Sequence, residues 1–115
     1  MGITPHARIR LGYLVERYEP GGTLDDVVVA TNRVALATEQ MGSDGVEVTY
    51  LGTTYLPEEE AILDAFAAPS IELVRAANER AGTTVARIAR AFFVTFQEAP
   101  GQERCTCQSD VGPLC

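Results

Sequence analysis

Thiols and imidazoles are scarce in this sequence, and their scarcity excludes several kinds of site. His6 is the single histidine, and the three cysteines, Cys105, Cys107 and Cys115, all lie within the last eleven residues. Residues 11–97 therefore contain neither a disulfide framework nor a Cys–His catalytic pair. A phosphate-binding P-loop, a dinucleotide-binding glycine motif and a Ser-His-Asp set are absent from the sequence as well.

Basic residues and long apolar runs are also few. Nine Lys and Arg stand against 16 Asp and Glu, which gives a net charge of −7. Nucleic acids and anionic membranes are bound through basic patches, so this balance argues against both partners. No apolar run approaches the ~20 residues that cross a bilayer, and the first residues lack the basic and apolar layout of a signal peptide. We expect a cytoplasmic protein.

The sequence does contain the same kind of strand–helix unit twice. With 115 residues, 46% of them hydrophobic, it has the size and composition of one globular domain. Alternation predicts strands at residues 11–19, 46–55, 61–66 and 87–96, and helical periodicity predicts helices at 24–41 and 70–81. Thr23 and Ser70 are the expected N-caps, and Gly42 and Gly82 the expected helix ends.

This order predicts an α+β, ferredoxin-like βαββαβ fold. The expected four-stranded antiparallel sheet has strand order 4-1-3-2 and both helices on one face, since crossovers are right-handed and connections short. Residues 1–10 are expected to form an arm, residues 11–97 the domain, and residues 98–115 a disordered tail that contains the cysteines.

The sheet face away from the helices is expected to carry a mixed apolar and polar set of side chains. The residues assigned to that face are Leu14, Glu16, Tyr18, Thr49, Leu51, Ile62, Asp64, Phe66, Ala91 and Phe93. An exposed apolar face of this size usually marks an association surface. We therefore expect a homodimer whose two sheets face each other and leave a ligand pocket between them.

Four stretches resemble a known family: Tyr-Leu-Val-Glu-Arg at 13–17, Gly-Val-Glu-Val-Thr-Tyr at 45–50, Ala-Pro-Ser at 68–70 and Asn-Glu-Arg-Ala-Gly at 78–82. They resemble the small ferredoxin-like family that includes a nickel-binding, nickel-responsive actinobacterial protein, in a domain otherwise of unknown function. The resemblance spans residues 11–96 and implies a ferredoxin-like fold and a dimer.

The nickel chemistry of that family does not carry over with the resemblance. The places of its histidines correspond here to Glu16, Thr31, Tyr50 and Asn78, and Asp64 stands on the third strand where relatives carry Cys or His. Nickel prefers imidazole and related donors, whereas carboxylate, amide and hydroxyl oxygens suit harder ions. The resemblance therefore implies where a pocket lies, and no nickel site.

The expected pocket combines these positions with two aromatic residues. Its residues are Glu16, Thr31, Tyr50, Asp64, Phe66, Asn78 and Phe93. Glu16 and Asp64 are expected to share one sheet face, where they would act as an acid and a base or hold a hard divalent cation. Alternatively, Glu16 pairs with Arg17 or Arg90, and Asp64 acts as a cap or binds a group of the partner subunit, while Thr31 and Asn78 satisfy backbone groups.

The three cysteines could bind a soft metal ion or form a redox disulfide, or they are incidental residues of the tail. Three functions remain open. The first is a non-catalytic binding protein that holds a small molecule or a metal ion between paired sheets. The second is a cofactor-free enzyme, of the monooxygenase, cyclase or isomerase type, with Glu16 or Asp64 as general base. The third is an interaction module without a pocket.

Overall fold

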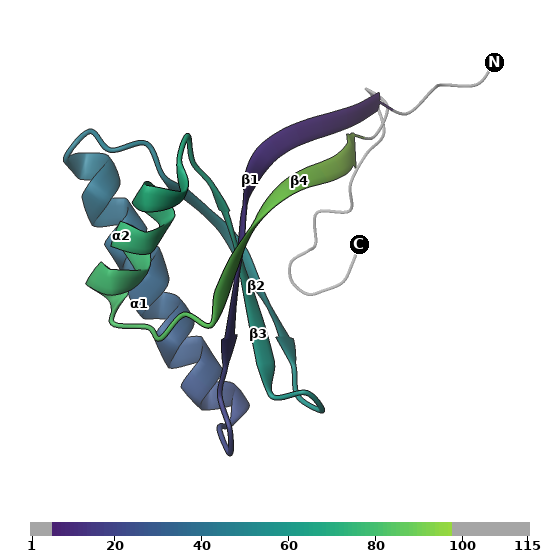
Figure 1. Ribbon diagram of the computed structural model, residues 1–115, viewed down its shortest axis with the longest axis vertical. Coiled ribbons are helices and arrows are strands. Elements are labelled where there is room, and N and C mark those ends of the chain that lie inside the picture. Colours follow the sequence, from purple (N-terminus) through teal and green to yellow (C-terminus); the bar gives the residue numbers. More distant parts are fainter. Residues whose placement is uncertain (1–5, 98–115) are drawn as a thin grey trace, which may run out of the picture. The chain divides into compact units, whose positions relative to one another are not determined.

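The computed structural model describes residues 6–97. The elements follow one another as β1 (His6–Tyr18), α1 (Leu24–Ser43), β2 (Thr49–Leu56), β3 (Ala61–Ala67), α2 (Ile71–Ala81) and β4 (Arg87–Gln97) (Figure 1). The sheet order is β2-β3-β1-β4. The predicted βαββαβ fold and strand order are therefore confirmed.

The first strand is longer than the sequence predicts. β1 begins at His6, so the last residues of the expected arm belong to a strand. The expected cysteine tail, with Cys105, Cys107 and Cys115, lies outside the described residues. Within residues 6–97, neither helix has both the length and the apolar character that a bilayer crossing requires.

The chain divides into two compact units, and each is described by itself. The larger unit, Arg10–Phe93, contains both helices and most of the sheet. The described part of the smaller unit consists of residues 6–9 of β1 and residues 94–97 of β4. These residues form a short two-stranded ribbon.

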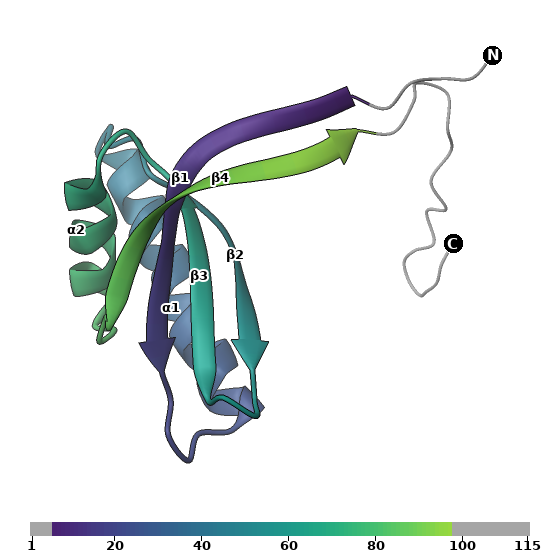
Figure 2. The same cartoon turned by 45° about the vertical axis from the view of Figure 1, so that its right-hand side comes forward.

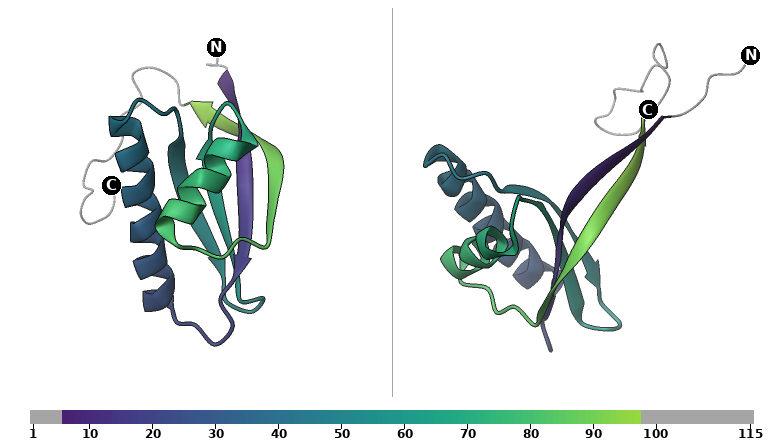
Figure 3. Two further views of the ribbon diagram at one scale, coloured as in Figure 1. Left: turned by 60° about the vertical axis from the view of Figure 1, so that its left-hand side comes forward. Right: turned by 45° about the horizontal axis from the view of Figure 1, so that its top comes forward.

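In the larger unit both helices pack on one face of the sheet (Figure 3). β1 pairs antiparallel with β3, and Val15 lies opposite Asp64 while Arg17 lies opposite Ile62. All four side chains are buried, so this set of alternate residues faces the helices. Val34 of α1 and Val74 of α2, both fully buried, pack into the same core as Val15.

The register corrects the face that was predicted for β3. Ile62, Asp64 and Phe66 were expected on the face away from the helices, but all three are fully buried on the helix side. β3 is apolar on both sides, and alternation cannot choose a face when both alternatives are apolar. A shift of one residue exchanges the two faces of a strand.

Alternate residues of all four strands form the opposite face, which we call the open face. Leu14 lies opposite Ala65, which lies opposite Gly52 of β2. On β4, Arg87 bonds to Glu16, and alternation then puts Ala89, Ala91 and Phe93 on the same side. The open face comprises Gly12, Leu14, Glu16, Tyr18, Thr49, Gly52, Thr54, Leu56, Leu63, Ala65, Ala67, Arg87, Ala89, Ala91 and Phe93. Within the larger unit, no other described element covers it (Figure 3).

β2 and β3 form a hairpin (Figure 2), and a bulge interrupts their pairing. Tyr50 lies opposite Phe66 and Gly52 opposite Ala65, so Leu51 has no position of its own in the register. Gly52 has a φ of 144°, a backbone conformation that glycine adopts without strain. The bulge reverses the alternation, and Tyr50 and Thr53 consequently face the same side of the sheet.

The two helix N-termini differ in a way that the sequence did not predict. The Thr23 side chain accepts a bond from the Asp26 N–H, and the Asp26 carboxylate accepts one from the Thr23 N–H, at 3.2 and 2.9 Å. This is a complete capping box. Ser70 occupies the N-cap of α2 but makes no side-chain capping bond.

We therefore expect Thr23→Ala to lower the free energy of unfolding by about 1 kcal/mol, the usual value for a lost cap. Ser70→Ala is the matched control and should change it much less, since no capping bond is lost. Urea unfolding followed by circular dichroism measures both variants. An equal or larger loss in Ser70→Ala would contradict the assignment.

Candidate functional site

A buried ion pair lies between the sheet and the helices. Arg17 Nε donates to Asp64 Oδ2 at 2.8 Å, and the two side chains are 4% and 0% exposed. Thr53 Oγ1 donates to Asp64 Oδ1 at 2.5 Å. Both carboxylate oxygens thus have a donor, as a charge removed from water requires.

The network continues to the edge strand through Tyr50. Its hydroxyl bonds to Thr53 Oγ1, and because the single Thr53 proton goes to Asp64, Tyr50 is the donor in this bond. The Tyr50 ring lies 5.7 Å from the Phe66 ring. The bulge at Leu51 makes this chain of bonds possible, since it turns Tyr50 and Thr53 to one face.

Two buried polar atoms among the described residues have no hydrogen-bond partner, Arg17 Nη2 and Thr31 Oγ1. Thr31 lies on α1 between Val27 and Val34, whose side chains are buried. The predicted bond from Thr31 to a backbone group is therefore not made. Asn78 does make one, since its Nδ2 donates to the Val74 carbonyl at 2.9 Å.

Glu16 belongs to a separate polar cluster on the open face. It accepts bonds from the Tyr18 hydroxyl at 2.7 Å and from Arg87 Nε at 3.1 Å. These bonds favour the ionised carboxylate, and they lower the pKa of Glu16 below its ordinary value of 4.5, with Tyr18 as the larger cause. The same bond to Glu16 raises the pKa of Tyr18 above 10.0. The predicted partners of Glu16, Arg17 or Arg90, were wrong.

Glu16 and Asp64 therefore do not form a pair. Glu16 lies opposite Leu63 on the open face, whereas Asp64 is buried under the helices. The prediction that both carboxylates share a face was wrong, because it placed Ile62, Asp64 and Phe66 of β3 on the face away from the helices. They cannot bind one cation together or divide acid and base roles at one substrate. In the described residues no group of three or more His, Cys, Asp or Glu side chains could hold a metal ion.

The remaining pocket residues of the sequence interpretation lie in several places. Phe93 is on the open face, where its ring is so close to Gly12 that a Cβ there would lie 2.7 Å from Cε2. Phe66 is part of the core. Tyr50 and Asn78 line two different depressions of the surface, one on each side of the helical layer. The structure does not bring the predicted residues together in one pocket.

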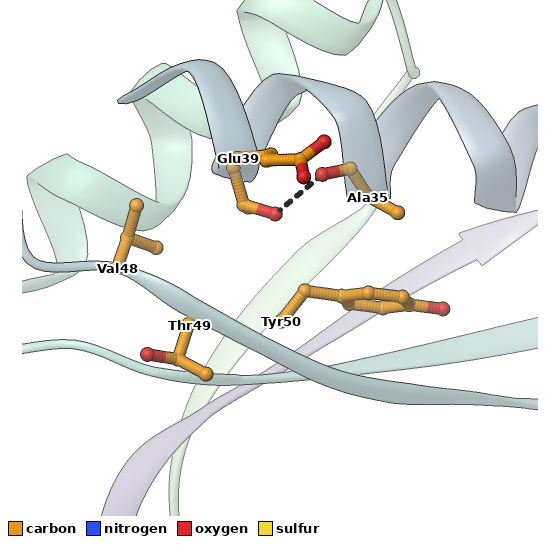
Figure 4. Close-up of a pocket in the computed structure, with 6 residues that line it drawn as sticks. Ala35, Glu39, Val48, Thr49 and Tyr50 are labelled. Carbon is orange, nitrogen blue, oxygen red and sulfur yellow. Dashed lines mark hydrogen bonds between the residues drawn. The ribbon is translucent and has the colours of Figure 1, made fainter. Parts of the chain in front are cut away.

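The larger of these depressions is an open groove of about 390 Å³ between α1 and the start of β2 (Figure 4). Its lining residues are Ala35, Thr38, Glu39, Val48, Thr49 and Tyr50. Glu39 is the one charged residue among them, and the Tyr50 ring extends under α1 (Figure 4). The smaller depression, about 190 Å³, lies between α2 and the start of β4. Neither combines enclosure with converging charged groups.

Comparison of the chain with protein-family models, with curated proteins and with solved structures found no match. The resemblance to the family with the nickel-binding member therefore stays a prediction.

The sequence interpretation did not single out Arg17 and Thr53, which bind the Asp64 carboxylate, or Ala65, which lies on the open face. One signal was available for Thr53, because a glycine within a strand pattern indicates a bulge, and Gly52 precedes it. Arg17 had no such signal, since an arginine next to a strand end is normally exposed.

Asp64→Ala leaves the Arg17 charge buried without its partner, and we expect it to lower the free energy of unfolding by about 3–5 kcal/mol. Replacing both groups by apolar ones, in Arg17→Met with Asp64→Leu, should recover most of that loss, since no unpaired charge remains. Urea unfolding at neutral pH compares the three proteins. A loss below about 1 kcal/mol in Asp64→Ala would contradict the buried pair.

The Glu16 cluster predicts a pH dependence. Because the folded-state pKa of Glu16 is lowered, its stabilisation is complete above pH 4.5 and disappears as the pH falls through the lowered value. The stability difference between the native chain and Glu16→Gln should therefore shrink on acidification. Tyr18 should ionise at lower pH in Glu16→Gln, as ultraviolet titration of tyrosinate would detect. A difference that is independent of pH, with unchanged Tyr18 titration, would refute the assignment.

Proposed function

We propose that this protein is a non-catalytic binding protein that acts as a homodimer and holds a small, mainly apolar molecule between the open faces of its two sheets. The observation that carries the proposal is the open face. It is mainly apolar, it lies uncovered by the helices, and six of its fifteen residues are glycine or alanine.

The first step is the association of two subunits. Leu14, Leu63 and Phe93 lie on the open face and are only partly buried in the single chain. Monomeric proteins rarely expose a continuous apolar sheet face. A second copy that presents the same face about a two-fold axis covers both surfaces at once, as in most homodimers.

The second step is the space that remains between the two sheets. Facing sheets pack about 10 Å apart, and large interdigitating side chains normally fill that distance. The open face instead has small residues with nothing large over them on three of its four strands: Gly52, Ala65, Ala67, Ala89 and Ala91. Alanine and glycine cannot fill the layer from either side. This supports a cavity bordered by the leucines and Phe93.

The third step is the chemistry of the ligand. The alanine and leucine side chains that border the proposed cavity favour a ligand whose main part is apolar. The Glu16, Tyr18 and Arg87 cluster supplies a carboxylate, a phenol and a guanidinium on the same face. Ligand pockets commonly combine apolar walls with a few polar groups that fix orientation. We therefore assign a ligand with an apolar body and one hydrogen-bonding group.

The geometry favours binding over catalysis and over metal binding. A general base works best with a pKa near the operating pH, whereas the bonds from Tyr18 and Arg87 lower the pKa of Glu16. Asp64 already accepts bonds at both oxygens and is completely buried. Neither carboxylate has the properties that the alternative enzyme requires.

The dimer is tested with Leu63→Asp, which places a charge in the centre of the proposed contact. We expect a folded monomer, since Leu63 lies on the face that has no helix over it. Leu36→Asp is the matched control, because Leu36 is 53% exposed on α1 and should leave the dimer unchanged. Sedimentation velocity measures both. Equal association states in the two variants would contradict the proposal.

The cavity is tested with the fluorescent probe anilinonaphthalene sulfonate, an apolar molecule with one polar group. We expect Ala65→Phe to reduce probe binding at least tenfold while the dimer persists, because the larger ring fills the space. Ala86→Phe, at an exposed alanine, is the control. Undiminished binding in Ala65→Phe would place the probe elsewhere and refute the cavity.

A further inference from the structure

We propose that the smaller depression, between α2 and the start of β4, is a second ligand site, which takes a free α-amino acid with a short aliphatic side chain. The second ligand site requires neither the homodimer nor the cavity of the proposed function. Its lining residues are Arg75, Asn78, Glu79, Thr83, Val85 and Ile88.

The end of α2 builds one wall of this depression and the chain that follows builds the other. The helix ends at Gly82, whose φ of 76° is a left-handed conformation that glycine adopts without strain. The Thr83 N–H then donates to the Asn78 carbonyl at 3.1 Å. This bond holds the chain against the last turn of the helix as it leaves toward β4. Val85 and Ile88 follow, and both pack against the core.

Two opposite charges stand at the rim of the depression. Arg75 and Glu79 lie one turn apart on α2, so their side chains are neighbours. A base that precedes an acid is the less favourable order for pairing within a helix. Within the described part of the chain, neither side chain takes part in an ion pair or a hydrogen bond. An α-amino acid carries a carboxylate for Arg75 and an ammonium group for Glu79 on one carbon atom, and both contacts are of the strong, charge-assisted kind.

The floor of the depression contains a buried amide. Asn78 is 1% exposed; its Nδ2 donates to the Val74 carbonyl at 2.9 Å, and its Oδ1 accepts from Thr83 Oγ1 at 2.8 Å. A side-chain amide has two hydrogens, and the second has no acceptor among residues 6–97. Buried polar groups normally have partners. A carboxylate oxygen of the ligand provides one.

The size and the apolar wall restrict the ligand further. The depression measures about 190 Å³, whereas pockets for drug-sized molecules measure about 300–1,000 Å³. The occupant is therefore a small molecule. Val85 and Ile88 are half-buried and offer their remaining surface to an apolar group. Together these features favour a short aliphatic side chain, such as that of valine, over an aromatic one.

The ligand class is tested by titration of isotope-labelled protein with three related molecules, followed by nuclear magnetic resonance. They are L-valine, isovalerate, which is valine without its ammonium group, and isobutylamine, which is valine without its carboxylate. We expect L-valine to shift the backbone amides of residues 75–88 saturably. The other two should bind about tenfold more weakly or worse, since each lacks one charged contact. No saturable shift at about 10 mM valine, where a site with a dissociation constant of roughly 1 mM is largely filled, overturns the proposal. Equal affinity for the three molecules overturns it as well.

Two variants assign the contacts. In Arg75→Gln the carboxylate loses its partner, so valine should bind no better than isobutylamine. In Glu79→Gln the ammonium group loses its partner, and valine should bind no better than isovalerate. Arg80→Gln and Glu72→Gln are the matched controls, since both residues are exposed on α2 outside the depression. A loss that is equal in the controls, or that affects all three ligands alike, overturns the assignment.

The variant Ala65→Phe separates the second ligand site from the proposed function. It fills the proposed cavity on the open face and should leave the affinity for valine unchanged. Valine binding that disappears in Ala65→Phe would place this ligand on the open face and overturn the second ligand site. Valine binding by a native chain that binds no anilinonaphthalene sulfonate would support the second ligand site and refute the cavity.

Discussion

The hydrogen-bonded ion pair of Arg17 and Asp64 decides which side of each central strand faces the helices. Both groups are removed from water, and such a pair is tolerated when its donors and acceptors meet one another. In the present register Arg17 Nε and Thr53 bind the two oxygens of Asp64. A shift of β3 by one residue would turn Asp64 to the open face and leave Arg17 buried without its partner. The pair thereby gives the sheet one register, although β3 is apolar on both sides.

The composition of the open face follows from that register. Because Ile62, Asp64 and Phe66 are used on the helix side, β3 presents Leu63, Ala65 and Ala67 to the other side. The bulge at Leu51 contributes in the same way, since it brings Thr53 to Asp64 and puts Gly52 on the open face. Ile62 and Phe66 of β3 thus support the core, and Ala65 and Ala67 create the space in which we propose that a ligand binds.

The sequence was sufficient for the fold and insufficient for the site, for physical reasons. Two strand–helix units with a capping residue before each helix predict the element order, and short right-handed connections predict the strand order. The face of β1 could be assigned because Glu16 alternates with Val15 and Arg17, which are buried. The face of β4 could be assigned because the alanines near Phe93 alternate with larger residues. The face of β3 could not, since Ile62 and Leu63 are equally apolar. The pairing of Arg17 with Asp64 joins residues 47 positions apart, and no local pattern reports it.

The side-chain hydrogen exchange of Arg17 tests this account most directly. Nuclear magnetic resonance resolves the Nε–H protons of individual arginines, and burial with a hydrogen bond to Asp64 should slow the exchange of the Arg17 proton with solvent by orders of magnitude relative to the exposed Arg75. The account predicts a persistent Arg17 signal in D2O that disappears in Asp64→Ala. Exchange as fast as that of Arg75 in the native chain would show that Asp64 does not hold Arg17, and the register and the open face derived from it would then be wrong.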